Sequence, residues 1–368
     1  MITDLTARPP SALLTAAENR LPHISTITKY GLGIAVCVSS FLFSSSLLAQ
    51  GPLAPPGPPA PTMKTLDQLD SKLDQAVSKG EARTPITSLP FTISVPGSYY
   101  LPKNLTIASG SPDTAININV SNVTVDLNGF SLIGTGGTGT PSGIRINGAS
   151  GSPLRGIAVK NGSIEGFYYA LYGFNAENCS WSDVRCSAPR STGIILQDSS
   201  GNLVKKVTVI GSVFTAFSFT GSANNNHVED CSATSSTANG FNLSPNTSGV
   251  GNVIERCLAQ GNTQTGFVIS GANVSGNVIR ECSATGNGAD GISLAGGTTG
   301  NRIDSNQASK NVGSGIRSLA TSKNIIVRNS LLGNTGAPSF AAGDLVGATI
   351  SAAGTFTSDQ PWANFIVP

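Results

Sequence analysis

Apolar residues recur along most of this chain in short alternating runs rather than at helical spacing. Between Asn226 and Asn334 the alternation repeats as one unit, Asn-x-apolar-x-x-Cys/Asn-x-Ala, followed later by Gly and an apolar residue. The full units start at residues 226, 252, 277 and 301, and a shortened one starts at 324. The first Asn is always five residues before the Cys/Asn position, and the Gly follows nine residues later. Only the return to the next unit varies, so the pattern predicts a solenoid with one coil per unit.

The same spacing continues towards the N-terminus, although fewer positions carry the residues typical of the repeat. The five- and nine-residue steps hold from Asn202 and from Cys179, and 123–129 (Val-Thr-Val-Asp-Leu-Asn-Gly) is typical of an earlier coil. The period is 23 to 26 residues wherever the register is clear. Short alternating runs punctuated by Gly and Asn favour strands and turns. The sequence therefore predicts an all-β solenoid of about eight coils over residues 115–335.

Equivalent residues of stacked coils lie above one another at about 4.8 Å, so each position of the repeat predicts a column. Three columns are apolar, and their burial is expected to be the main stabilising contribution. The first contains Trp181, Val204, Val228, Ile254, Ile279, Ile303 and Ile326. The second contains Cys186, Val209, Ala233, Ala259, Ala284, Ala308 and Leu331. The third, directly after the Gly, contains Ile194, Phe217, Phe241, Phe267, Ile292 and Ile316.

Cysteine and asparagine share a fourth column. Cys231, Cys257 and Cys282 stand in successive coils, followed by Asn306 and Asn329. Buried thiols acting as small hydrophobic side chains fit this column best, and one disulfide between neighbours or a metal site are the alternatives. Five places further on, a second set of asparagines predicts a structural ladder of stacked amides rather than a ligand site. Its members are Asn262, Asn287, Asn311 and Asn334.

Four segments lie outside the repeat. Residues 1–49 resemble an export signal, in which basic residues precede an apolar stretch, and an uncleaved signal anchor is the alternative. Residues 50–83 combine a Pro-rich linker with a short helix. Residues 84–114 and 336–368 are expected to cap the two ends, because an unpaired end coil is a template for aggregation.

The short helix is predicted from Thr65, a candidate N-cap, to about Lys79. Leu66, Leu69, Leu73 and Val77 recur at helical spacing and form one apolar face. We expect this face to pack on the end of the solenoid, and a weak coiled coil is the alternative.

Composition excludes several functions. The chain has 43 Gly, only 11% charged residues and a net charge of +2, with acids and bases interspersed. It therefore lacks the basic surface that nucleic-acid binding requires. We find no phosphate-binding loop, no zinc-ligand spacing and no Ser/His/Asp set, so no cofactor and no metal site is predicted. A monomer is expected, with a membrane as partner only if the signal is not cleaved.

The most charged part of the repeat lies between the first apolar column and the Cys/Asn column. One interpretation is a ladder of solvated ion pairs that fixes the register of the coils. The other is a polysaccharide-binding strip with a carboxylate pair for acid–base chemistry. We favour the ion pairs, because the signs alternate between coils. The candidate binding residues of this charged strip are Lys205, Lys206, Glu229, Asp230, Glu255, Arg256, Arg280, Glu281 and Asp304.

The repeat, with its Asn and Cys stacks and Gly-apolar steps, resembles the right-handed parallel β-helix proteins of the pectate-lyase-like superfamily. The layout of signal, Pro-rich spacer and 362–365 (Trp-Ala-Asn-Phe) near the end is similar to a group of exported bacterial β-helix repeat proteins. The resemblance implies a single-stranded right-handed parallel β-helix. It identifies no catalytic residue, because the acidic, His and Arg/Lys motifs of the superfamily's galacturonases and calcium-dependent lyases are absent.

Two functions follow from these observations. The first is an exported protein, secreted, periplasmic or on the cell surface, that binds polysaccharide or the cell envelope or serves as a structural surface protein. The alternative is a polysaccharide lyase or glycoside hydrolase. Catalytic residues remain unassigned, and we lean against an enzyme.

Overall fold

The computed structural model describes residues 64–367, apart from 81, 112, 137–138, 320–322 and 352–358. The predicted signal and the Pro-rich spacer lie outside the described residues. The one described helix is α1 (Leu66–Gly80). It begins as predicted at Thr65, whose Oγ1 accepts a hydrogen bond from the Gln68 backbone N–H while Gln68 Oε1 accepts one from Thr65 N. Leu66, Leu69 and Leu73 are exposed, so the expected packing of this face on the solenoid is not observed. No helix among the described residues is long and apolar enough to cross a membrane.

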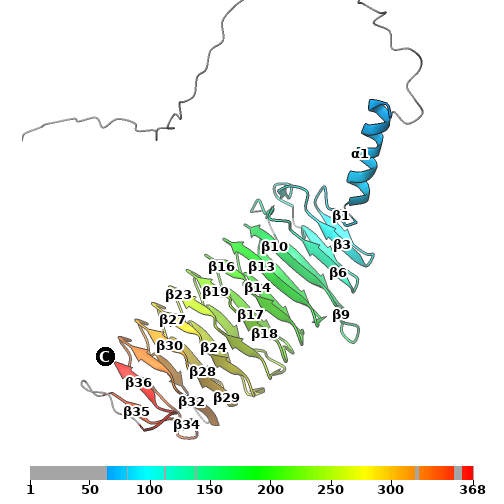
Figure 1. Cartoon of the computed structure of the whole chain (residues 1–368). Helices are drawn as coiled ribbons and strands as arrows, with labels where there is room; N and C mark the ends of the chain where they lie inside the picture. Colours follow the sequence, from blue (N-terminus) through cyan, green and yellow to red (C-terminus); the bar gives the residue numbers. More distant parts are fainter. Residues whose placement is uncertain are drawn as a thin grey trace, which may run out of the picture. The chain divides into compact units, whose positions relative to one another are not determined.

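The rest of the chain is a parallel β-solenoid (Figure 1). Each coil carries three strand positions, and every strand pairs in parallel with its equivalents in the neighbouring coils. The first position comprises β3 (Gly97–Tyr100), β6 (Val123–Asp126), β15 (Leu203–Lys205), β18 (His227–Glu229), β22 (Val253–Glu255), β26 (Val278–Arg280), β29 (Thr299–Asp304) and β32 (Lys323–Val327). The second comprises β4 (Leu105–Thr106), β7 (Ser131–Ile133), β16 (Thr208–Ile210), β19 (Ser232–Thr234), β23 (Leu258–Gln260), β27 (Ser283–Thr285), β30 (Gln307–Ser309), β33 (Ser330–Leu332) and β36 (Asn364–Val367). Two longer strands, β10 (Ala158–Glu165) and β13 (Ser180–Ser187), run through both positions.

The third position forms a separate ten-stranded sheet. Its strands are β2 (Phe91–Ile93), β5 (Ile116–Ile118), β8 (Ser142–Asn147), β11 (Tyr169–Phe174), β14 (Ile194–Gln197), β17 (Phe217–Thr220), β20 (Phe241–Leu243), β24 (Phe267–Ser270), β28 (Ile292–Ala295) and β31 (Ile316–Ser318). Short strands complete the connections and the ends: β1 (Thr84–Pro85), β9 (Leu154–Arg155), β12 (Ala176–Glu177), β21 (Gly249–Val250), β25 (Val274–Ser275), β34 (Leu345–Val346) and β35 (Thr349–Ile350).

The solenoid has about ten coils, not the eight predicted. Nine strands of the third position, from β5 to β31, lie within 115–335. One further coil lies within 84–114, where β2, β3 and β4 pair in register with β5, β6 and β7. This coil has neither Asn nor Gly at the positions where the repeat has them, so the repeat pattern did not reveal it. The segment expected as a cap is therefore itself wound as the first coil.

The three apolar columns are confirmed as the core. Strand register places their members in successive coils, and their side chains are buried. In the third column, the rings of Phe217, Phe241 and Phe267 stack nearly parallel, with centroids 4.4 and 4.8 Å apart. Parallel stacking follows from the fold, because equivalent side chains adopt the same rotamer one strand spacing apart.

Asparagine ladders run along the solenoid, including the predicted ladder of Asn262, Asn287, Asn311 and Asn334. A second ladder occupies the first position of the repeat. There the Oδ1 of Asn252 accepts bonds from the backbone N (2.9 Å) and the Nδ2 (3.0 Å) of Asn226. The same contacts repeat through the buried residues Asn202, Asn226, Asn252, Asn277, Asn301 and Asn324. At the end of this ladder Asn324 N donates to the carboxylate of Asp344 at 3.0 Å.

The Cys/Asn column works in the same way. The Sγ of Cys257 accepts the backbone N–H of Cys231 at 3.4 Å, and the Sγ of Cys282 accepts that of Cys257 at 3.4 Å. The next acceptor, for the N–H of Cys282, is Asn306 Oδ1 at 2.9 Å. Sulfur and amide oxygen therefore fill the same role, which explains why the repeat accepts either residue. All five described cysteines are buried and free, so neither a disulfide nor an exposed thiol is observed among them.

Candidate functional site

The charged strip divides into two columns with different backbone. The strands of the first position end at Lys205, Glu229, Glu255, Arg280, Asp304 and Val327. The residues that follow them occupy the bend before the second position with left-handed backbone, at φ between 50° and 58°. These bend residues are Lys206, Asp230, Arg256, Glu281, Ser305 and Arg328.

Ion pairs connect the strip along the solenoid axis. Lys205 Nζ lies 2.7 Å from Glu229 Oε1, and Arg256 Nε lies 2.8 Å from Asp230 Oδ1, both as the sequence predicts. Arg280 lies between Glu255 and Asp304 in strand register, and its guanidinium pairs with Glu255 of the preceding coil. The carboxylate of Asp304 is bound instead by Arg302 at 2.8 Å and Arg328 at 2.5 Å.

Glu255 is the most enclosed acid of the strip, with a side chain only 5% exposed. Burial alone would raise its pKa, but hydrogen bonds from Arg280, Arg256 and His227 outweigh burial and lower the pKa to about 2. Burial opposes the arginine contacts of Asp304 in the same way, and its pKa is also lowered to about 2. Both carboxylates are therefore ionised and neutralised by guanidinium groups at neutral pH, which suits a structural ladder better than a general acid.

His227, Glu229 and Glu255 place three ligand atoms within 4.8 Å of one another. This group is the one described cluster with the composition of a metal site. However, Arg256 already binds both carboxylates, at 2.6 Å from Glu229 Oε2 and 2.7 Å from Glu255 Oε1. A cation would have to displace that guanidinium, so the cluster is poorly prepared for a metal. His227 Nε2 lies 3.1 Å from Glu255 Oε1.

The structure brings together a second group of side chains that the sequence analysis missed. Tyr168, Tyr169, Tyr172 and Phe174, which we call the aromatic patch, lie half-buried at and just before β11. Their rings touch in sequence, with centroids 4.7, 5.5 and 6.2 Å apart. Burial raises the pKa of Tyr169 and of Tyr172, so both hydroxyls stay protonated. The available signal was five aromatic residues within the eight positions 167–174.

Polar side chains border the aromatic patch along the axis. The guanidinium of Arg145 lies over the Tyr172 ring, 4.9 Å from its centroid, and its Nε is buried without a hydrogen-bond partner. On the other side, the Tyr172 hydroxyl donates to Gln197 Oε1 at 2.6 Å. Two coils further along, Phe214 is 56% exposed in the turn before β17. Its backbone N–H donates to Ser191 O, and the backbone N–H of Ser191 donates to Tyr168 O, so the three residues occupy equivalent positions in successive coils. The aromatic patch is therefore bordered by Arg145 towards the N-terminal coils and by Gln197 and the exposed Phe214 towards the C-terminal coils.

A shallow hollow adjoins the patch at each end. The first, of about 390 Å³, is lined by Pro90, Thr92, Asp113, Thr114, Asn117, Arg145 and Asn147. The second, of about 460 Å³, is lined by Gln197, Asp198, Thr220, Gly221, Ser244, Asn246 and Thr247. Arg145 and Gln197 connect the hollows to Tyr172, so one surface extends from the first coil to the seventh. At about 4.8 Å per coil this surface is about 29 Å long.

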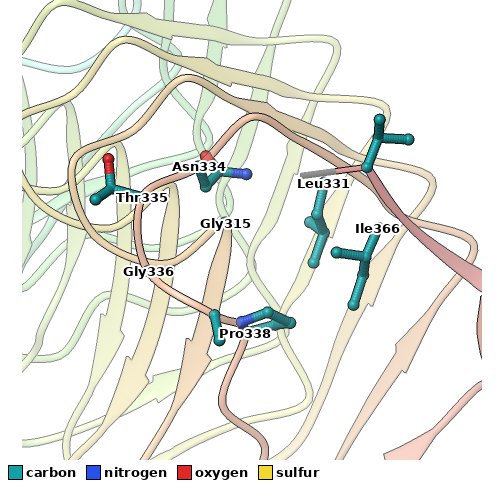
Figure 2. Close-up of a pocket in the computed structure, with 9 residues that line it drawn as sticks. Gly315, Leu331, Asn334, Thr335, Gly336, Pro338 and Ile366 are labelled. Atoms are coloured by element: carbon teal, nitrogen blue, oxygen red, sulfur yellow. The ribbon is translucent and has the colours of Figure 1, made fainter. Parts of the chain in front are cut away.

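A smaller cavity of about 260 Å³ lies at the C-terminal end of the solenoid (Figure 2). Leu331, Ile366 and Pro338 surround it, beside Asn334 at the end of its ladder. These are the side chains on which a further coil would stack. The cavity is therefore the end of the core rather than a separate site.

Comparison with known proteins agrees with this geometry. The sequence model of the family described as "Right handed beta helix region" matches residues 223–358. This match agrees with the parallel β-helix fold that the structure shows. A second model, that of the periplasmic copper-binding protein NosD, matches residues 104–274 of the β-helix protein. No match was found among curated protein sequences.

Several solved structures are similar to this β-helix protein. The mannuronan C-5 epimerase AlgE6 A-module of Azotobacter vinelandii is 13% identical, with a TM-score of 0.48, covering 82% of this chain and 94% of that one. The Dettilon tailspike protein is 14% identical, with a TM-score of 0.46, covering 83% of this chain and 65% of that one. The catalytic domain of a GH87 alpha-1,3-glucanase in complex with nigerose is 14% identical, with a TM-score of 0.44, covering 80% and 70%. Likenesses at this level carry no argument about function.

Proposed function

We propose that this protein is exported and binds polysaccharide, free or in the cell envelope, through the outer face of the ten-stranded sheet. The observation that carries the proposal is the aromatic patch, a cluster of half-exposed rings on an otherwise small and polar surface. Sugar rings present apolar C–H faces with hydroxyls at their rims. Burying such a face on an aromatic ring removes apolar area from water, while polar side chains at the edge bond the hydroxyls.

The polar borders of the patch fit this mode of binding. The unpartnered Nε of Arg145 and the Gln197 amide lie on opposite sides of Tyr172. The other guanidinium nitrogens of Arg145 and the amide nitrogen of Gln197 are hydrogen-bond donors that ligand hydroxyls at the edge of the patch can accept from. Because the surface lies on rigid strands, binding requires little ordering of side chains.

Export is supported by the signal-like sequence of residues 1–49 and by the periplasmic description of the NosD model. The copper in that description has no matching site among the described residues, because Arg256 occupies the carboxylates beside His227. Acid–base catalysis by the charged strip is disfavoured for the same reason, since arginines hold its enclosed carboxylates ionised.

Affinity electrophoresis of the full-length chain through gels that contain a panel of soluble polysaccharides tests the proposal. We expect at least one gel to retard the protein, and Tyr172→Ala to weaken that binding about tenfold, equivalent to about 1.4 kcal/mol. Val268→Ala is the matched control, because it truncates another half-buried residue in the same outward column but away from the patch. Equal binding by the Tyr172→Ala variant and the wild type would place the site elsewhere.

The enzymatic alternative is tested with the same polysaccharides. Incubation should yield neither unsaturated products nor new reducing ends. Turnover that is lost in Asp230→Ala would instead assign a catalytic role to the charged strip.

A further inference from the structure

The outer face of the ten-stranded sheet is almost without charge. Strand register places one outward residue of each coil in a single column. From the first coil to the last these residues are Thr92, Asn117, Arg145, Tyr172, Ile195, Ser218, Asn242, Val268, Ser293 and Arg317. Arg317 lies 3.6 Å from Asp290, so its charge is already compensated. Arg145 is the one cation of the column without a carboxylate partner among the described residues.

The neighbouring outward column is neutral throughout its paired part. It contains Asn147, Phe174, Gln197 and Thr220 in register. Two carboxylates, those of Asp113 and Asp198, take part in the lining of the two hollows. The first hollow therefore holds one cation and one anion, and the second holds one anion.

This distribution discriminates between classes of polysaccharide. A polymer of uronic acids brings a carboxylate with every sugar residue. Along about 29 Å of surface it would meet one unpaired cation in the outward columns, Arg145, and a second beside the aromatic patch, Arg190, whose guanidinium lies 5.9 Å from the centroid of the Tyr168 ring. Its remaining carboxylates would lose water without gaining a charged partner, and they would approach Asp113 and Asp198. Neutral sugars need only hydrogen-bond donors and acceptors of the kind that Asn, Gln and Thr side chains supply.

We propose that the ligand of this surface is a neutral polysaccharide, bound lengthwise along the solenoid axis with a sugar ring on the aromatic patch. This inference rests on the proposed polysaccharide binding and specifies the class of ligand. The hydroxyl groups of one sugar are bonded in the first hollow between Arg145 and Asn147, and those of another in the second hollow at Gln197 and Thr220. Arg145 acts here as a hydrogen-bond donor that Tyr172 orients, and not as the partner of an anion.

Paired affinity gels test the inference with the full-length chain. One set contains soluble neutral glucans and mannans, and the other contains polygalacturonate or alginate, each run at low and at high salt. We expect retardation in a neutral gel that high salt leaves unchanged, because exposed charges contribute little to it. We expect no retardation by either polyuronate.

Arg145→Gln and Asp113→Asn separate the outcomes further. For a neutral ligand, Arg145→Gln lowers affinity several-fold without changing its salt dependence, and Asp113→Asn has a similarly modest effect. Retardation by polyuronate that disappears in high salt and in Arg145→Gln would overturn the neutral ligand and leave polysaccharide binding intact. Absence of retardation in every gel would overturn polysaccharide binding itself.

Discussion

The buried ladder at Asn252 offers a sharp test of how the coils are held together. In Asn252→Ala, four hydrogen bonds disappear. The lost acceptor, Oδ1, receives the N and Nδ2 of Asn226 at 2.9 and 3.0 Å, and the lost donor, Nδ2, binds Ala223 O at 2.8 Å and Asn277 Oδ1 at 2.9 Å. At about 1 kcal/mol each, and with the buried N–H of Asn226 left unpaired, we expect unfolding to become easier by about 4 kcal/mol.

Urea unfolding of the full-length chain measures this loss. Trp181 is 1% exposed in the core and Trp362 is 52% exposed, so fluorescence reports mainly on the coil that contains Trp181. Far-UV circular dichroism should follow the same transition, which checks that unfolding is cooperative. With a slope of about 2–3 kcal/mol/M, the midpoint falls by about 1.5 M.

Asn242→Ala is the matched control, because it removes an asparagine from the outer face. Its Oδ1 accepts only from Ser244 Oγ at 2.7 Å, and the residue is half-buried. We expect a change below about 0.5 kcal/mol. If the two variants unfold at the same urea concentration, the amide ladder does not stabilise the stack and the reasoning fails.

Three further predictions concern other columns. The five described cysteines should not react with a thiol reagent at neutral pH in the native protein, because burial raises the pKa of thiols such as Cys179, to about 11, and each should react after unfolding without reductant. Glu255 has a lowered pKa, so its contribution to stability is present above the unfolded pKa and is lost as the pH falls from about 5 to about 2; melting temperatures over this range should fall less steeply in Glu255→Gln. Lys206→Asn should stabilise the protein by about 0.5–1 kcal/mol, because asparagine tolerates the left-handed bend better than lysine, and an unchanged melting temperature would contradict this.

Sequence alone predicted the parts of the fold that repeat. The columns at Ile254, Ala259 and Phe267 follow from spacing, since a fixed number of residues per coil fixes which side chains point inward. The exchange of Cys282 for Asn306 in one column was visible, but its cause was not. That cause is the backbone N–H of the preceding coil, which each residue accepts with a different atom.

The parts that do not repeat were harder to predict. The first coil, at β2–β4, does not carry the Asn, Cys/Asn and Gly residues of the repeat, so the sequence predicts a cap there instead of a coil. The aromatic patch was missed because its coil carries Ala170-Leu171 in place of the Gly-apolar step, and the outward residue Tyr172 was never aligned with Arg145 and Ile195. The partner of Arg280 depends on side-chain rotamers rather than register, and this choice lies beyond any column argument.

Asp344 ends the long asparagine ladder of the solenoid. Every asparagine of the ladder from Asn202 to Asn324 accepts hydrogen bonds from the preceding coil and donates hydrogen bonds to the following one. Each coil therefore provides donors that the next coil must accept. The carboxylate of Asp344 accepts from Asn324 but has no side-chain N–H, and the backbone N–H of Asp344 donates back to Ala341 O rather than to a further coil. The hydrogen-bond relay along this column therefore ends at Asp344. Asp344→Asn would extend the amide ladder by one residue and present side-chain N–H donors at the end of the column, where the wild-type chain presents a carboxylate.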